Sequence, residues 1–112
     1  MKDIYNLKAY SLSSLGIDGA AFEKDDAIKV VEYMRDECIP ISGGDVFRVI
    51  DDSIEVTYDN WNCDRNHQES MRDYLYRSCD KAIEYITNYP VESKAEEIYI
   101  FQISATVLAT IE

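Results

Sequence analysis

The sequence lacks any long apolar run. Nowhere in its 112 residues do about 18 uncharged apolar residues follow one another, the length that a helix needs to cross a membrane. The residues behind Met1-Lys2-Asp3-Ile4 also lack the apolar stretch of a secretion signal. We therefore expect a protein that is neither exported nor inserted into a membrane but stays in the cytoplasm.

Basic residues are also scarce. Eleven lysines and arginines stand against 22 aspartates and glutamates, which leaves a net charge of -11. A field of this sign repels phosphate backbones and anionic lipids, so we expect neither direct nucleic-acid binding nor a membrane partner. It would attract a basic protein, for example a nuclease whose cleft is cationic because it holds nucleic acid. Solubility alone would also account for the acidity.

Histidine and cysteine, the usual ligands of zinc, are few. His67 is the single histidine, and the three cysteines are an odd number at wide spacings, which favours reduced thiols over a disulfide framework. Cys63 and His67 are spaced like half of a zinc site. The other half is missing, because neither Cys38 nor Cys79 has a second ligand nearby in the sequence.

Two other motifs resemble ligand-binding loops but lack the residues that bind the ligand. Residues 59–64 are acidic like a calcium loop, but Trp61 and Cys63 occupy positions that need hard oxygen ligands. Gly43-Gly44 lacks the spacing and the lysine of a phosphate-binding loop, so these glycines more naturally supply backbone conformations with positive φ. We expect no cofactor, no metal and no catalytic residues.

The length and the apolar periodicity predict one domain, residues 1–112, with two amphipathic helices. The first covers residues 24–37 and ends before Pro40; the second runs to about Tyr89 and ends at Pro90. Asn66 and Glu69 have the spacing of a capping box for the second helix. The expected buried positions are Ala27, Val31, Met34 and Cys38 in the first helix and Met71, Leu75, Cys79, Ala82 and Ile86 in the second.

Strands are predicted between and after these helices. Residues 45–50 and 54–58 are predicted to form a hairpin around the polar turn Asp51-Asp52-Ser53, and Gly43-Gly44-Asp45 supplies a turn or bulge. Residues 97–110 are rich in β-branched and aromatic residues and predict a final strand. Residues 1–22 are weakly patterned and are interpreted as a short helix and a docking segment. The predicted class is α+β: a small antiparallel sheet with two main helices packed on one face, in the order helix-strand-strand-helix-strand.

The stretch from Thr57 to Asp64 is the most unusual part of the sequence. A tryptophan among carboxylates and amides is typical of an interface hot spot. In the alternative interpretation, Trp61 covers the end of the sheet and is buried. The predicted partner-binding residues are Asp45, Tyr58, Asp59, Asn60, Trp61 and Asp64, with Trp61 and Tyr58 as anchors.

Two segments carry a family resemblance. Residues 39–47 (IPISGGDVF) followed by residues 57–64 (TYDNWNCD) resemble immunity protein 40, one of the small bacterial immunity-protein families of polymorphic toxin systems. Residues 77–86 and 24–28 agree with the same family. The resemblance implies a cytoplasmic protein that binds and neutralises a cognate toxin domain, and it supplies no contact residues.

Two other functions remain open from the sequence. A small hydrolase would use the carboxylates with Cys63 or His67, and it would need a pocket that holds at least two of these groups within hydrogen-bond reach. A self-associating structural protein would pair its final strand edge to edge with another copy. The expected state is a monomer or a weak homodimer.

Overall fold

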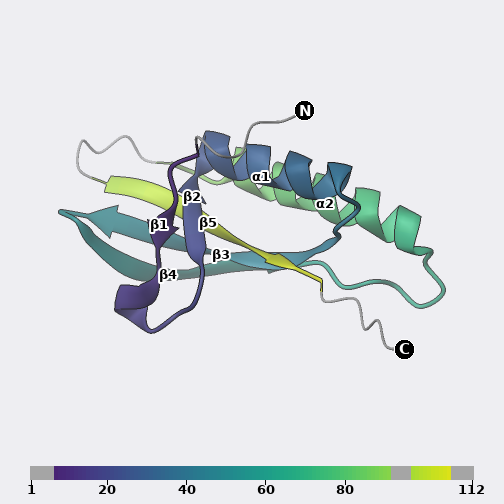
Figure 1. Cartoon of the computed structure of the whole chain (residues 1–112), viewed down its shortest axis with the longest axis horizontal. Coiled ribbons are helices and arrows are strands. Elements are labelled where there is room, and N and C mark those ends of the chain that lie inside the picture. The colour runs from purple at the N-terminus through teal and green to yellow at the C-terminus, as the bar shows by residue number, and fades with distance from the viewer. Residues whose placement is uncertain (1–6, 92–96, 107–112) are drawn as a thin grey trace.

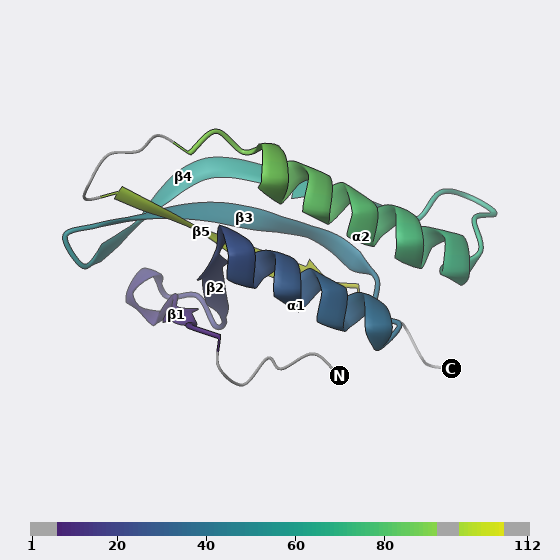
Figure 2. The ribbon, with the colours of Figure 1, turned by 90° about the horizontal axis from the view of Figure 1, so that it is seen from above.

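The molecule consists of an antiparallel sheet with two helices lying side by side on one of its faces (Figure 1 and Figure 2). The computed structural model describes residues 7–91 and 97–106. Its elements are β1 (Tyr10–Ser11), the 3-10 turn η1 (Ser13–Leu15), β2 (Ala20–Glu23), α1 (Lys24–Asp36), β3 (Ile41–Ile50), β4 (Ser53–Asn62), α2 (Met71–Asn88) and β5 (Glu97–Ala105). The predicted α+β class, with both helices on one face, is confirmed.

The sheet contains five strands in the order β1-β2-β5-β3-β4. β5 lies inside the sheet, where it pairs with β3 along its length and with β2 at Phe101 and Ile100. The final strand is therefore not an edge strand. Edge-to-edge self-association through this strand would need it to be one. β4 forms one edge of the sheet, and this position exposes it to partners.

Helix α1 follows β2 without a connecting loop. Its first turn carries Asp25 and Asp26, whose charges suit the partly positive end of a helix. The helix buries Ala27, Val31 and Met34 as predicted. Cys38 does not continue this buried stripe: it follows the helix end with φ of 59° and is exposed.

Helix α2 begins later than the sequence indicated. Ser70, rather than Asn66, is its cap, and the Ser70 hydroxyl accepts a hydrogen bond of 3.0 Å from the backbone N–H of Asp73. Glu69 still accepts from the backbone N–H of Asn66 at 2.9 Å, but this bond closes a turn that precedes the helix. Met71 is 36% exposed, so it is not in the buried stripe.

Among the described residues, neither α1 nor α2 has the length and apolar composition that a membrane-spanning helix requires.

The predicted hairpin is present but longer at its open end. Asp51 and Asp52 have φ values of 48° and 65°, as the tight two-residue turn between Ile50 and Ser53 requires. Gly43 and Gly44 lie within β3 rather than in a turn, but the predicted bulge is supported, because the register of β3 against β5 shifts between Ile41 and Gly43. β4 continues to Asn62, four residues beyond the predicted end of the strand at Tyr58.

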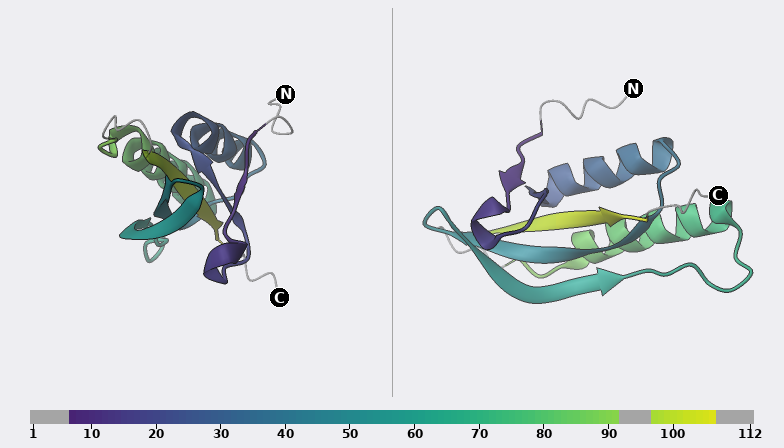
Figure 3. Two further views of the ribbon diagram at one scale, coloured as in Figure 1. Left: turned by 90° about the vertical axis from the view of Figure 1, so that its left-hand side faces the viewer. Right: turned by 60° about the horizontal axis from the view of Figure 1, so that its bottom comes forward.

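Residues 10–15 cover the opposite face of the sheet. Leu12 is fully buried there in a second, smaller core with Ala21, Phe47 and Ile100. Figure 3 shows the 3-10 turn beside the sheet, away from the helices. The short helix expected within residues 1–22 is absent from the described residues 7–22, which contain two strands and the 3-10 turn.

Candidate protein-binding surface at the edge of the sheet

The glycine pair of β3 makes room for the tryptophan of β4. Gly44 lies opposite Trp61 in the ladder, and a Cβ atom at Gly44 would overlap both the indole ring and the carbonyl oxygen of Gln102. Gly43 has φ of 152°, as expected for a glycine-specific conformation, and a Cβ there would overlap the backbone oxygen of Trp61. The two segments that carry the family resemblance therefore contact each other in the fold.

Trp61 is a core residue. Its side chain is 4% exposed, and its ring stacks on Tyr85 of α2 with centroids 4.8 Å apart. The interpretation in which Trp61 covers the sheet and is buried is confirmed, and its prediction as an exposed anchor is wrong. The sequence alone could not distinguish a buried from an exposed Trp61, because the space above Gly44 exists only once the strands have paired.

A bulge in β4 exposes the neighbouring tyrosine instead. Asp45 pairs with Asn60 and Phe47 pairs with Val56, so three residues of β4, 57–59, lie opposite the single residue between Asp45 and Phe47. The Thr57 hydroxyl stabilises the bulge: it donates to the carbonyl oxygen of Val46 at 2.7 Å and accepts from the backbone N–H of Asp59 at 3.0 Å.

Tyr58 occupies the centre of the bulge in a left-handed conformation. Its φ is 69° and its side chain is 85% exposed. A non-glycine residue in this region costs roughly 1–2 kcal/mol, and an aromatic ring in water gains little in return. Strained residues of this kind cluster at functional sites.

The other predicted residues of β3 and β4 point to both faces of the sheet. Asp59 faces the helices, where its carboxylate accepts a hydrogen bond of 2.6 Å from the Tyr89 hydroxyl. Asp45 and Asn60 alternate with Gly44 and Trp61, so they lie on the opposite face, and both are exposed. The bulge and its neighbours therefore form a continuous edge that a partner can contact from two sides.

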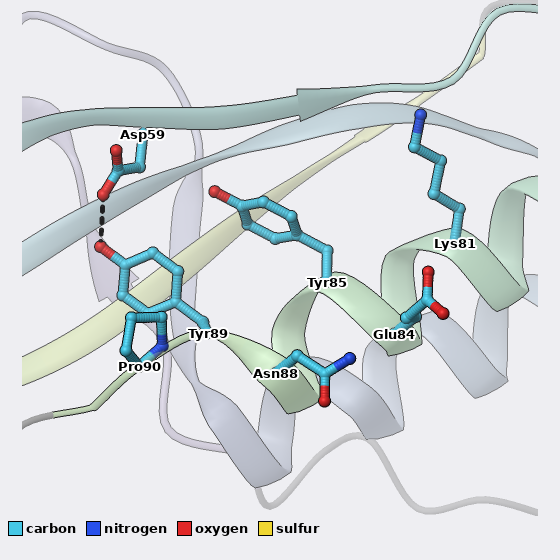
Figure 4. Close-up of a pocket in the computed structure, with 7 residues that line it drawn as sticks. All are labelled: Asp59, Lys81, Glu84, Tyr85, Asn88, Tyr89 and Pro90. Atoms are coloured by element: carbon cyan, nitrogen blue, oxygen red, sulfur yellow. Dashed lines mark hydrogen bonds between the residues drawn. The ribbon is translucent and has the colours of Figure 1, made fainter.

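A groove lies on the helical side of this edge. Its volume is about 510 Å³, and its lining residues are Asp59, Lys81, Glu84, Tyr85, Asn88, Tyr89 and Pro90. Figure 4 shows that Asp59 is the contribution of β4, whereas the other side chains come from α2 and the two residues that follow it, Tyr89 and Pro90.

The electrostatics of the groove keep the Tyr89 hydroxyl in its donor form. Burial, and next the hydrogen bond to Asp59, raise the pKa of Tyr89 above its ordinary value. Burial also raises the pKa of Tyr85, with smaller contributions from Asp59 and Asp45. Both phenols therefore stay neutral at physiological pH, and Tyr89 holds one Asp59 oxygen in place.

Asp64 lies beyond the end of β4, in a loop that Arg77 attaches to α2. The Arg77 guanidinium donates to the Asp64 carbonyl oxygen at 2.6 Å, to the Cys63 sulfur at 3.2 Å, and to both carboxylate oxygens of Glu69 at 2.8 and 2.7 Å. Arg77, and next the backbone N–H of Asn66, lower the pKa of Glu69 to about 2. Asp64 is exposed but does not line the groove.

The hydrolase hypothesis needs Cys63 or His67 beside the carboxylates, and of these groups the groove contains the carboxylates Asp59 and Glu84. Cys63 is 2% exposed, His67 is exposed in a turn before α2, and neither lines the groove. Burial raises the pKa of Cys79, which makes this thiol a poor nucleophile. Across residues 7–91 and 97–106, no group of three or more histidines, cysteines and acidic residues could hold a metal ion. The groove thus combines aromatic surface with charged side chains.

The contribution of α2 to this surface was not predicted from the sequence. Tyr85 and Tyr89 are four residues apart and therefore share one side of the helix. That spacing was a usable signal, but the side of α2 that faces β4 follows only from the packing of Trp61 against Tyr85.

A comparison with known proteins agrees with the resemblance carried by the two motifs. The family model described as Immunity protein 40 matches residues 11–104. No curated protein and no solved structure gives a significant match. Because the family model spans both helices, the glycine pair, the bulge and Trp61, the chain belongs to the immunity protein 40 family.

Proposed function

We propose that this protein binds and neutralises a cognate bacterial toxin domain through the edge of the sheet at β4. Family membership implies an immunity protein with a toxin partner. The proposed contact region, called the β4 edge surface below, consists of Asp45, Tyr58, Asp59 and Asn60 with the groove beside α2. It acts by binding and covering the toxin, without chemistry of its own.

The observation that carries this proposal is the conformation of Tyr58. The bulge holds an aromatic ring outward, 85% exposed, at a positive φ that disfavours tyrosine. Tyrosine is enriched among interface hot spots, where its ring loses water and its hydroxyl gains a partner. The conformational cost in the free protein is offset if the ring is buried in a complex.

The charge of the chain indicates the kind of toxin. A net charge of -11 increases the rate of encounter with a basic partner, and Asp45 and Asp59 place two carboxylates on opposite faces of the same edge. A nuclease domain with a cationic cleft fits this description. The encounter would take place in the cytoplasm of the producing cell, before the toxin reaches its target.

Co-expression tests the proposal. The toxin domain encoded beside this protein is expressed in a sensitive host with the wild-type chain, with Tyr58→Ala, or with Tyr76→Ala as a control at an exposed tyrosine of α2. We expect the wild type and Tyr76→Ala to protect the cells, and Tyr58→Ala to bind the toxin roughly 30-fold or more weakly, as for a hot-spot residue. Equal protection by both variants would contradict the proposed surface, and no protection by the wild type would contradict the function.

A further inference from the structure

We propose that the groove between β4 and the second half of α2 receives an arginine side chain of the toxin. The inference rests on the proposed function and deepens it, because it assigns the chemistry of one contact. The groove has a volume of about 510 Å³, enough for one side chain together with adjoining atoms of its backbone.

The aromatic wall of the groove is preorganised. Tyr85 is stacked on the buried Trp61 at 4.8 Å, and Tyr89 meets Phe101 edge-on at 5.5 Å and Tyr99 at 5.4 Å. The rings of Tyr85 and Tyr89 are 6.0 Å apart. Both side chains extend from α2 toward β4 (Figure 4), so the core packing fixes them before any partner arrives.

The charged wall of the groove favours a cation. Asp59 and Glu84 contribute two carboxylates against the single ammonium of Lys81, and Lys81 already donates to the Asn62 carbonyl oxygen at 2.6 Å. One Asp59 oxygen accepts from Tyr89 at 2.6 Å, and this carboxylate makes no other side-chain hydrogen bond among the described residues. An anionic ligand would face both carboxylates, whereas a cation gains from each.

The shape of the site favours arginine over lysine. A guanidinium is flat, stacks on tyrosine faces, and donates several N–H groups in one plane to a carboxylate. Asp59 supplies such a carboxylate beside the Tyr89 ring (Figure 4). A lysine ammonium would use the charge but would gain little from the flat aromatic wall. The net charge of -11 favours the approach of a partner that carries such a cation.

A titration with small probes tests the groove without a toxin. Nα-acetyl-arginine methylamide is added to the whole protein and followed by NMR, with Nα-acetyl-lysine methylamide as the probe of equal charge. We expect shifts at the Tyr85 and Tyr89 ring signals, arginine binding at least threefold tighter than lysine, and a loss of at least fivefold in Asp59→Asn. Asparagine still accepts from Tyr89, and Asp51→Asn at the hairpin turn is the control of equal charge change. Equal binding of both probes, or no shifts at these rings, would overturn the inference.

The toxin provides the second arm. Surface arginines of the toxin domain are replaced by alanine one at a time and combined with Asp59→Asn and Asp51→Asn. One arginine should show a coupling of at least tenfold in Kd with Asp59→Asn and none with Asp51→Asn. If the wild type neutralises the toxin but no arginine couples to Asp59, the groove assignment is wrong while the proposed function stands. If the wild type does not neutralise it, the proposed function fails and the probe titration alone decides the chemistry of the groove.

Discussion

Replacing Tyr58 by glycine is expected to make the protein more stable and, at the same time, a weaker inhibitor of its toxin. Tyr58 has φ of 69°, a region that costs a non-glycine residue roughly 1–2 kcal/mol. Glycine removes this cost but loses about 0.5–1 kcal/mol through its freer unfolded chain. Because the side chain is 85% exposed, little buried area is lost with it. The expected net gain is about 0.5–1 kcal/mol.

Thermal and urea unfolding, monitored by circular dichroism, measure this gain. For a chain of 112 residues it corresponds to an increase in Tm of about 2–4 °C. The Kd for the toxin should rise roughly 30-fold or more, since the ring that forms the contact is absent. Tyr58→Asn should behave similarly, because asparagine tolerates positive φ.

Gln68→Gly is the matched control. Gln68 is exposed and has φ of 70°, nearly the same conformation as Tyr58, but it lies in the loop before α2 and outside the β4 edge surface. The same relief of strain predicts the same gain in Tm with no change in Kd. If Tyr58→Gly lowered the stability, or if Gln68→Gly weakened toxin binding equally, the reasoning about the bulge would be refuted.

Three further predictions concern the scaffold that holds this surface. Gly44→Ala should lower the free energy of unfolding by about 1–3 kcal/mol in urea titrations, because the new Cβ overlaps the Trp61 ring and a backbone oxygen; a change below about 0.5 kcal/mol would contradict the close approach. Glu69→Gln should remove a pH dependence of stability. The folded pKa of Glu69 is lowered from 4.5 to about 2, so its contribution is complete above pH 4.5 and is lost as the pH falls toward 2; an unchanged slope over this window in urea midpoints would refute it. Ser78→Ala should cost about 1–3 kcal/mol, because its buried hydroxyl accepts from the backbone N–H of Ile41 at 3.0 Å, whereas Thr87→Ala on the exposed side of α2 should change the unfolding midpoint little.

The parts of the fold that the sequence predicted are those encoded by local periodicity. The buried stripe of α2, from Leu75 to Ile86, follows the helical repeat, and Pro90 marks its end. The turn at Asp51 and Asp52 was predictable because two short polar residues there separate two apolar runs.

The parts that the sequence did not predict depend on tertiary contacts. Gly43 and Gly44 have the composition of a turn, but they lie in a strand, where a side chain at Gly44 would overlap the Trp61 ring and one at Gly43 would overlap the Trp61 carbonyl oxygen. Trp61 was wrongly predicted as an exposed anchor because its burial depends on the glycines of another strand, and the sequence does not show that they lie beside it. Tyr58 was predicted as a second anchor, but the bulge that exposes it requires the register of β3 against β4.

The sequence also could not predict that α2 forms one wall of the groove. Tyr85 and Tyr89 share one side of a helix that the sequence located correctly, but nothing local indicates that this side faces Asp59. Likewise, the burial of Leu12 depends on tertiary contacts, because Leu12 packs against Phe47 and Ile100 on the face of the sheet that the helices do not cover.

The most direct test of the central claim is backbone hydrogen exchange of the protein with and without its toxin. If the β4 edge surface is the contact region, the amides of residues 57–62 should exchange at least tenfold more slowly in the complex, together with the tyrosine-bearing end of α2. The 3-10 turn Ser13–Leu15, on the other side of the sheet, should exchange at the same rate in both states. Protection confined to that turn or to the loop before α2, with residues 57–62 unchanged, would contradict the account.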